Sequence, residues 1–390
     1  MKTETAYLLR LLRAFIHGEA APSLPNDVDG DVLSRLAQAG SVSGIVGQMV
    51  QPFADRFSDK AITFLNRQFY GTVGMYANKG LACDALFAAL RAAEIPFAVV
   101  KGAVVRLLYP MPELRTFGDV DIYVPLAFRE AVRDIVKDDT LLLEDAKQIY
   151  VKRPPLHVEF HFDLTSDAVK YLPKLQTYLC EMEQHFAVVK DVETVDPLYH
   201  FVYLLSHQMR HFEDDSPGIR SFLDLAVFLK SDIAPSAEVL QPLLKDLGLY
   251  AYAQVALTLT ALWFGVESPL PLADIPTEDL DFLAEYIVDA GQFAREQNPR
   301  AAAVQQKGGR IKALFGALFP SPEEMRKNAT YAVLARKWLP LAYAYRLYRG
   351  VFQRSEYALG AAKDIGSAEK DAAARRRVGI LMGGKNIEKT

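Results

Sequence analysis

The stretch DVDIYVP, which begins at Asp119, constrains the fold more than any other part of the sequence. Successive side chains of a β-strand point to opposite faces, so Asp119, Asp121 and Tyr123 would share one face. The other face would consist of apolar residues that can pack on a core, namely Val120, Ile122 and Val124. The pattern therefore predicts a strand with one buried face and one face that carries two carboxylates.

A second alternating stretch, LHVEFHF at 156–162, places Glu159 on one face between His157 and His161. If the two strands are neighbours, Glu159 completes a cluster of three carboxylates with Asp119 and Asp121. Carboxylates this close repel one another unless a divalent cation lies between them, and hard oxygen ligands suit Mg²⁺. Such a cluster can hold two ions, one that activates an attacking hydroxyl group and one that accompanies the leaving pyrophosphate.

The segment before these strands has the features of a phosphate site. FAVVKG at 97–102 is typical of a buried strand closed by Gly102, and the AVVRLLY that follows is typical of a short helix. Glycine lets the backbone approach a phosphate closely, and a helix N-terminus offers N–H donors without intrahelical partners. Lys101 and Arg115 would add positive charge there.

Hydrophobic periodicity divides the rest of the chain into helical and mixed regions. Helical spacing covers 1–92, including a proline-free stretch at 61–93, and returns at the helix start formed by Asp196 and Pro197. Between them lie a charged helix pattern at 127–137 and strand patterns at 141–144, 148–152 and 156–162. We therefore expect an α+β protein with an N-terminal helical region (1–92), a core with a mixed sheet (93–195), a C-terminal α-helical domain (196–360) and a flexible tail (361–390).

Charge and hydropathy limit the classes of partner. Lys and Arg number 44 against 48 acidic residues, a formal charge of −4, whereas dedicated nucleic-acid binders usually carry a basic footprint. The uncharged segment 247–266 is long enough for a membrane span, but its polar and glycine residues favour a buried helix. The N-terminal segment is interrupted by charges and lacks the apolar stretch of a signal peptide, which predicts a cytoplasmic protein.

The motif KGAVVRLLYPMPELRTFGDVDIYV, followed by HVEFHFDL and by LYHFVYLLSHQMRHF and IRSFLDLAVFL, resembles a known family. It is similar to the uncharacterised bacterial nucleotidyltransferase family, which belongs to the DNA polymerase β-like nucleotidyltransferase superfamily. The resemblance covers about 93–230. It implies a polymerase β-like core and a transferase that depends on two Mg²⁺ ions, with Mn²⁺ as an alternative.

The resemblance also implies roles for individual residues. Asp119 and Asp121 would bind both metals, and Glu159 would bind the catalytic metal and draw the proton from the attacking hydroxyl group. The nucleotide-binding residues would be Lys101, Gly102, Ala103 and Arg115. In the wider superfamily Ser or Gly usually follows the glycine; here it is Ala103, which could contact phosphate only through its backbone N–H.

Several polar residues of the helical region are further candidates. His207 and His211 have the spacing of zinc ligands on a helix, although the glutamate of an HExxH motif is missing. A position facing the cleft between the core and the C-terminal helices is another interpretation of this pair, as it is for His157 and His161. Arg220 and Asp224 stand four residues apart, which predicts a helical salt bridge, and the resemblance makes Asp224 a candidate for the same cleft.

The sequence therefore favours an enzyme that transfers a nucleoside monophosphate from a nucleoside triphosphate to a hydroxyl group of a small molecule, a sugar or a protein. ATP is slightly favoured as the donor, and we expect neither extended nucleic acid nor a membrane span. Two alternatives remain open at this point. One is a catalytically inactive nucleotide-binding module, suggested by Ala103. The other is a metal-dependent phosphohydrolase that uses the aspartates with His157 and His161.

Overall fold

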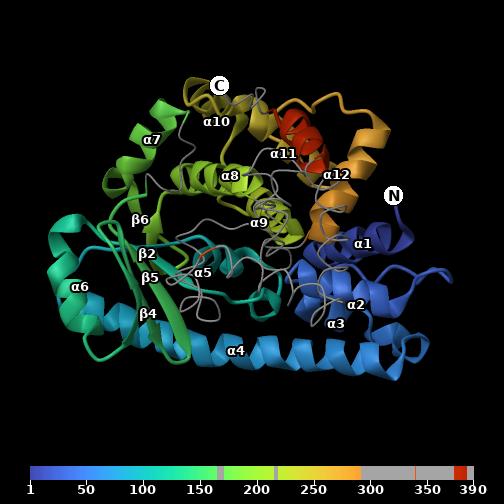
Figure 1. The fold of residues 1–390 in the computed structure, drawn as a ribbon, viewed down its shortest axis with the longest axis horizontal. Helices are drawn as coiled ribbons and strands as arrows, with labels where there is room; N and C mark the ends of the chain where they lie inside the picture. Colours follow the sequence, from blue (N-terminus) through green and yellow to red (C-terminus); the bar gives the residue numbers. More distant parts are fainter. Residues whose placement is uncertain (165–170, 215–217, 291–338, 340–372, 384–390) are drawn as a thin grey trace. The chain divides into compact units, whose positions relative to one another are not determined.

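The computed structural model describes residues 1–164, 171–214, 218–290, 339 and 373–383 (Figure 1). The chain divides into two compact units, one of Met1–Gln292 with Leu381–Thr390 and one of Phe293–Ile380, and the elements below belong to the first. Its helices are α1 (Thr3–His17), α2 (Gly30–Ala39), α3 (Ser43–Met49), α4 (Asp59–Ala92), α5 (Gly102–Val105), α6 (Arg129–Val136), α7 (Pro173–Cys180), α8 (Pro197–Asp214), α9 (Gly218–Lys230), α10 (Ala237–Asp246), α11 (Tyr250–Phe264) and α12 (Thr277–Ala290). Its strands are β1 (Ala98–Val100), β2 (Val120–Tyr123), β3 (Thr140–Glu144), β4 (Gln148–Arg153), β5 (Leu156–His161), β6 (Phe186–Val189) and β7 (Val192–Val195).

Five of the strands form one mixed sheet in the order β1-β2-β5-β4-β3. β2 and β5 run parallel, whereas β1 and β2, β4 and β5, and β3 and β4 pair antiparallel. The predicted α+β class and its mixed sheet are confirmed, and so are the helices predicted before the sheet and those predicted after it up to residue 290. The parallel pairing of β2 and β5 decides where the carboxylates lie.

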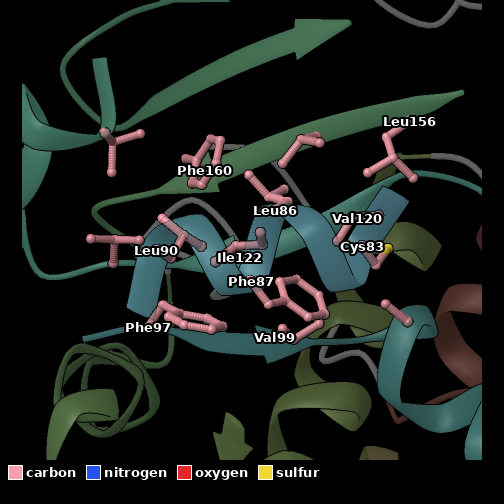
Figure 2. Close-up of a cluster of buried hydrophobic side chains, with 14 of the residues drawn as sticks. Cys83, Leu86, Phe87, Leu90, Phe97, Val99, Val120, Ile122, Leu156 and Phe160 are labelled. Atoms are coloured by element: carbon pink, nitrogen blue, oxygen red, sulfur yellow. The ribbon is translucent and has the colours of Figure 1, made fainter. Parts of the chain in front are cut away.

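One face of this sheet is covered by helices and forms an apolar core (Figure 2). The side chains that alternate with the carboxylates on β2 and β5, such as Ile122 and Phe160, are fully buried here. They pack against Cys83, Leu86, Phe87 and Leu90 of α4 and against Val132 and Val136 of α6. Each such side chain contributes about 1.5–3 kcal/mol by leaving water, so this face fixes the orientation of both strands.

The 34-residue helix α4 connects this core to the N-terminal helices. Its N-terminus is capped by Ser58, whose side chain accepts a hydrogen bond from the backbone N–H of Ala61. Near this end α4 packs on α3 so closely that a Cβ added to Gly47 would lie 2.5 Å from the carbonyl oxygen of Leu65. Its other end carries the core residues beneath the sheet, so one helix positions both regions (Figure 1).

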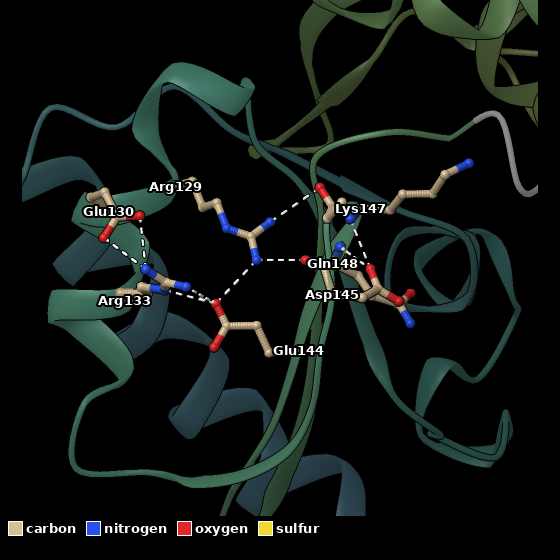
Figure 3. Close-up of polar contacts among 8 residues, drawn as sticks. Arg129, Glu130, Arg133, Glu144, Asp145, Lys147 and Gln148 are labelled. Carbon is tan, nitrogen blue, oxygen red and sulfur yellow. Dashed lines mark hydrogen bonds and ion pairs between the residues drawn. The ribbon is translucent and has the colours of Figure 1, made fainter.

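At the edge of the sheet, ion pairs attach β3 to α6 (Figure 3). Arg129 and Arg133 both contact the Glu144 carboxylate, and Arg133 also pairs with Glu130 at 2.9 Å. Three leucines of β3, Leu141, Leu142 and Leu143, are exposed beside this network. These polar contacts lie on the surface, in contrast to those of the candidate site below.

Two elements of the structure were not predicted from the sequence. The hairpin of β6 and β7 was not expected, because its turn is formed by Lys190 and Asp191, both with positive φ (52° and 63°), rather than by the glycine that usually marks such a turn. Residues 373–381, in the segment expected to be a flexible tail, form a helix that belongs to the second unit up to Ile380. Met382 behind this helix is buried, and Gly383 approaches the backbone of Ala251, so tertiary contacts hold the end of that segment.

The apolar segment 247–266 forms the buried helix α11, as predicted. The helix ends at Gly265, whose left-handed conformation (φ 66°) terminates it. Among the described residues, no helix combines the length and the hydropathy that a membrane crossing requires. Most of the predicted helical domain beyond residue 290 lies outside the described residues.

Candidate functional site

The two central strands bring two of the predicted carboxylates side by side. The register of the parallel pair β2 and β5 places Asp121 opposite Glu159, so both side chains lie on the face opposite the apolar core. Both are partly buried. Asp119 comes directly before β2 and is exposed. The sequence parity thus predicted correctly which residues of the two strands share a face.

His161 lies beside this pair. Its Nε2 is 3.0 Å from Oδ1 of Asp121 and 3.8 Å from Oε2 of Glu159, and the side chain is buried. Within the described part of the chain, Asp121, Glu159 and His161 form a group whose ligand atoms lie within 4.8 Å of one another. This arrangement can hold a metal ion.

Positive charge on one side keeps Asp121 ionised. Burial alone would raise the pKa of this carboxyl group, but Lys101, whose Nζ is 3.1 Å from Oδ1, and His161 outweigh it and lower the pKa to about 2. The Lys101 ammonium group also lies 5.7 Å from the centre of the Tyr203 ring on α8. Asp121 is therefore a permanent anion at neutral pH and a hard oxygen donor.

Asp119 is connected to the neighbouring strand through Tyr150 of β4. The Tyr150 hydroxyl group donates a hydrogen bond to Oδ2 of Asp119 at 3.2 Å and lies 3.2 Å from Nδ1 of His157. Burial and the nearby Asp119 carboxylate raise the pKa of Tyr150 to about 12. The structure thus places His157 next to Tyr150, while His161 lies at the carboxylates.

Lys79 of α4 forms hydrogen bonds with the loop before Asp119. Its Nζ donates hydrogen bonds to the carbonyl oxygens of Phe117 and Gly118 at 2.9 and 2.8 Å, and the side chain is buried. Burial lowers the pKa of Lys79. Since Gly118 immediately precedes Asp119, Lys79 positions the start of the carboxylate strand.

The turn between β1 and α5 contains Lys101 and Gly102. Lys101 has a positive φ (55°), an uncommon conformation for a residue with a Cβ. Its backbone N–H donates to Nε2 of His200, a buried residue of α8, at 3.1 Å. Burial lowers the pKa of His200 to about 4, so the imidazole is neutral and able to accept this bond. The N–H groups of Gly102 and Ala103 have no acceptor among the described residues.

The sequence predicted that the side chain of Arg115 contacts phosphate, but in the structure this side chain contacts a carboxylate of the protein. Its guanidinium makes a bidentate ion pair with Asp224 of α9, with distances of 2.7 and 2.8 Å, and Tyr109 donates to the same carboxylate at 2.7 Å. The guanidinium also fills the space beside Gly102, where an added Cβ would lie 2.6 Å from Nη1. A side chain at residue 102 would displace the ion pair of Arg115 and Asp224, so the packing of this ion pair requires a glycine here.

The predicted ion pair between Arg220 and Asp224 does not form, because Arg115 and Tyr109 occupy the Asp224 carboxylate. The remaining candidates on α8, His207 and His211, contact each other through Nε2 atoms 3.0 Å apart. They are not part of the group of candidate ligands around Asp121. Whether these residues face a substrate stays a prediction.

The residues at the carboxylate face fit a divalent cation. Asp121 and Glu159 present carboxylate oxygens, the donors that Mg²⁺ prefers. His161 adds an imidazole nitrogen, a donor that suits zinc or manganese better. In this structure Asp119 stands beside the group and contacts Tyr150. The donor set therefore supports a metal site without selecting the ion.

Several residues that shape the site were not among the predicted site residues. They are Lys79, Tyr109, Tyr150 and His200. His200 gave a weak signal, since it shares a helix face with His207 and His211. The others carry no local pattern, because their partners lie far away in the sequence.

One comparison with known proteins identifies the family of the chain. The chain matches the model of a family described as uncharacterised nucleotidyltransferase over residues 26–265, which is more than half of its 390 residues. No curated protein and no solved structure matches the chain. The family match spans both carboxylate strands, the Lys101 turn and the helices α8 and α9. The chain therefore belongs to this family of uncharacterised nucleotidyltransferases.

Proposed function

We propose that this protein transfers a nucleoside monophosphate from a nucleoside triphosphate to a hydroxyl group and releases pyrophosphate. The observation that carries the proposal is the register of β2 and β5, which sets Asp121 opposite Glu159 next to the Lys101–Gly102 turn. Carboxylates that bind metal beside a turn that binds phosphate are what nucleotidyl transfer requires. In this proposal the mixed sheet is a polymerase β-like core.

Asp119, Asp121 and Glu159 would hold two Mg²⁺ ions, with Mn²⁺ as an alternative. When bound, such ions lower the pKa of the attacking hydroxyl group and neutralise charge on the phosphates. Glu159 is the more exposed of the two paired carboxylates (25% against 13% for the side chain of Asp121). Glu159 therefore suits the role of proton acceptor, while Asp121, held by Lys101 and His161, suits a fixed ligand.

The Lys101–Gly102 turn would bind the phosphates. The N–H groups of Gly102 and Ala103 point out of the first turn of α5 without acceptors among the described residues. Ala103 would then contact phosphate through its backbone N–H, so a hydroxyl side chain at this position is not required. Arg115 acts here as a support, since its ion pair with Asp224 fixes the guanidinium against Gly102.

The acceptor would be a small molecule, a sugar or a protein. The net charge of −4 disfavours a long nucleic acid as the partner. ATP is the first donor to test, followed by the other three nucleotides.

The test is a thermal-shift titration of wild type and of an Asp119→Ala/Asp121→Ala variant with each nucleotide, with and without Mg²⁺. The matched control is Asp134→Ala/Asp138→Ala, which removes two exposed carboxylates near α6. We expect one nucleotide to stabilise wild type and control only when Mg²⁺ is present, and not to stabilise the site variant. If no nucleotide shifts any of the proteins, the transferase proposal is withdrawn.

A metal-dependent phosphohydrolase is the second candidate, and His161 is the observation that favours it. An imidazole 3.0 Å from Asp121 and 3.8 Å from Glu159 is a suitable zinc or manganese ligand. Metal analysis of the purified protein separates the two functions. Bound zinc, with phosphate release from simple phosphoesters and no nucleotide-dependent stabilisation, would favour the hydrolase.

A catalytically inactive nucleotide-binding module is the third candidate. Nucleotide carrying a labelled α-phosphate distinguishes it from a transferase, because a transferase moves the label to an acceptor and releases pyrophosphate. Binding that depends on Mg²⁺, without transfer of label to any acceptor class, would identify the inactive module. The presence of Asp119, Asp121 and Glu159 supports catalysis, since a site that only binds nucleotide has no need of a proton acceptor.

A further inference from the structure

Arg220 is a charged side chain near the site that has no partner within the described part of the chain. It lies in the first turn of α9 and is partly buried. The described residues give its guanidinium no hydrogen bond and no ion pair. Removing a guanidinium from water without an anion beside it is unfavourable by several kcal/mol as an order of magnitude, so this position needs an explanation.

The nearest acid on the same helix does not neutralise Arg220. Asp224 stands one helical turn away, which is the spacing of an ordinary ion pair. Its two oxygens instead accept three hydrogen bonds from Arg115 and Tyr109. The guanidinium groups of Arg115 and Arg220 are therefore both near the Asp224 carboxylate, and only that of Arg115 is bonded to it.

The pKa of Arg220 reflects this excess of positive charge. Burial and the charge of Arg115 lower the pKa of Arg220 to about 10, against the opposing effect of Asp224 and Asp119. Arg220 is thus still a cation at neutral pH, close enough to Asp119 for their charges to interact. A bound anion would remove the unfavourable charge.

The position of Arg220 indicates which anion. Arg115, the partner of Asp224, lies directly against Gly102 at the start of α5. Arg220 is one helical turn from Asp224 on α9, and α9 packs against α5. Arg220 therefore lies within electrostatic range of Arg115 and Asp119, on a helix that packs against the short helix after the Lys101–Gly102 turn.

We propose that Arg220 binds a phosphate group of the nucleoside triphosphate and so completes the phosphate site at the Gly102 end. This inference rests on the proposed function. The other two cations of the site are already engaged by carboxylates, Lys101 by Asp121 and Arg115 by Asp224. The planar guanidinium fork matches two phosphate oxygens, which a lysine ammonium group cannot do.

The test measures binding of inorganic tripolyphosphate, with Mg²⁺ present, by isothermal titration calorimetry. The variants are Arg220→Gln, which removes the charge, and Arg220→Lys, which keeps the charge but not the fork. Arg35→Gln on the exposed face of α2 is the matched control. We expect tripolyphosphate to bind Arg220→Gln about tenfold or more weakly than wild type, Arg220→Lys to be intermediate, and the control to be unchanged.

A second measurement separates binding from a structural role. Because Arg220 has no partner among the described residues of the ligand-free protein, Arg220→Gln should unfold at the same temperature as wild type or higher. It should also lose the thermal stabilisation that tripolyphosphate gives to wild type. A large drop in the melting temperature of ligand-free Arg220→Gln would overturn the proposal, because it would show that Arg220 supports the fold.

The outcomes distinguish this inference from the proposed function. If Arg220→Gln binds tripolyphosphate and nucleotide as tightly as wild type, the role of Arg220 is wrong while the transferase proposal stands. If tripolyphosphate binding depends on Arg220 but no monophosphate is ever transferred, the phosphate site is correct and the transferase proposal fails. If wild type binds neither tripolyphosphate nor nucleotide, both are wrong.

Discussion

The two faces of the central sheet are built from the same strands but held in opposite ways. On β5, Phe160 points into a continuous apolar core, and its neighbour Glu159 points to the face with Asp121, Lys101 and His161. The side chains of the apolar face are stabilised by burial. On the carboxylate face nearly every partly buried charge contacts an opposite charge or a hydrogen-bond donor.

This difference shows how the fold separates stability from chemistry. Residues on the apolar face can be judged by the volume they fill, since burial of hydrocarbon is non-directional. Residues on the carboxylate face act through charge and geometry. Repulsion among their charges lowers the stability of the fold, and burial of the apolar face compensates for this loss. Substitutions of adjacent residues should therefore have effects of different kinds.

The largest expected effect is the loss of activity in Glu159→Gln. In the proposed reaction Glu159 takes the proton of the attacking hydroxyl group, which glutamine cannot do, so the rate of nucleotidyl transfer should fall about 10²–10⁴-fold. The rate of pyrophosphate release with the nucleotide identified by thermal shift measures this. The free energy of unfolding should change little, and Asp134→Asn on the exposed side of α6 should leave the rate unchanged. Full activity in Glu159→Gln would remove this residue from the mechanism.

The adjacent substitution Phe160→Ala should affect stability instead. Phe160 is fully buried, and the cavity left by alanine should lower the free energy of unfolding by about 3–5 kcal/mol. Urea unfolding followed by circular dichroism measures the change, and Phe160→Leu should lose much less. A loss below 1 kcal/mol would mean that the core can collapse around the missing ring.

Acid should destabilise the protein through His200. Its pKa is about 4 in the folded protein because of burial, against 6.5 for the free side chain. The unfolded chain therefore binds the proton first, and the free energy of unfolding falls as the pH drops from 6.5 to 4, by about 3 kcal/mol in total. His200→Gln, whose amide oxygen can still accept from Lys101, should show a flatter pH dependence over this window. An identical slope in both proteins would contradict the assignment.

Lys79 belongs to the helix under the apolar face but contacts the loop that leads to Asp119. Lys79→Met would leave the carbonyl oxygens of Phe117 and Gly118 without their donor, which should cost about 1–3 kcal/mol of stability. It should also weaken nucleotide binding that depends on Mg²⁺, as seen by thermal shift. Lys60→Met at the exposed start of the same helix is the control and should change neither.

The smallest effect is expected at the edge of the sheet. Arg133 is half exposed, and its ion pairs with Glu130 and Glu144 lie at the surface (Figure 3). Arg133→Gln should lower the free energy of unfolding by about 1 kcal/mol or less, and less still at high salt. A larger loss, measured by urea unfolding, would show that β3 depends on this network.

The sequence alone predicted the sheet and which face carries the carboxylates, because strand parity is a local property. Asp121 and Glu159 needed only the assumption that their strands are neighbours. It could not predict the contacts that support them. Arg115 meets Asp224 across 109 positions and Lys101 meets His200 across 99, and such pairs depend on how helices dock. The expected pair of Arg220 and Asp224 was wrong for this reason, since a distant arginine occupied the carboxylate.

The parallel pairing of β2 and β5 has a consequence for how members of this family can diverge. The register between these strands is set by their own backbone hydrogen bonds and by the apolar side chains beneath them. The connecting segment, with α6 and the hairpin of β3 and β4, can therefore change in length or sequence at its outer edge without separating Asp121 from Glu159. Variation in this connecting segment would change the surface beside the carboxylates and leave their spacing as it is.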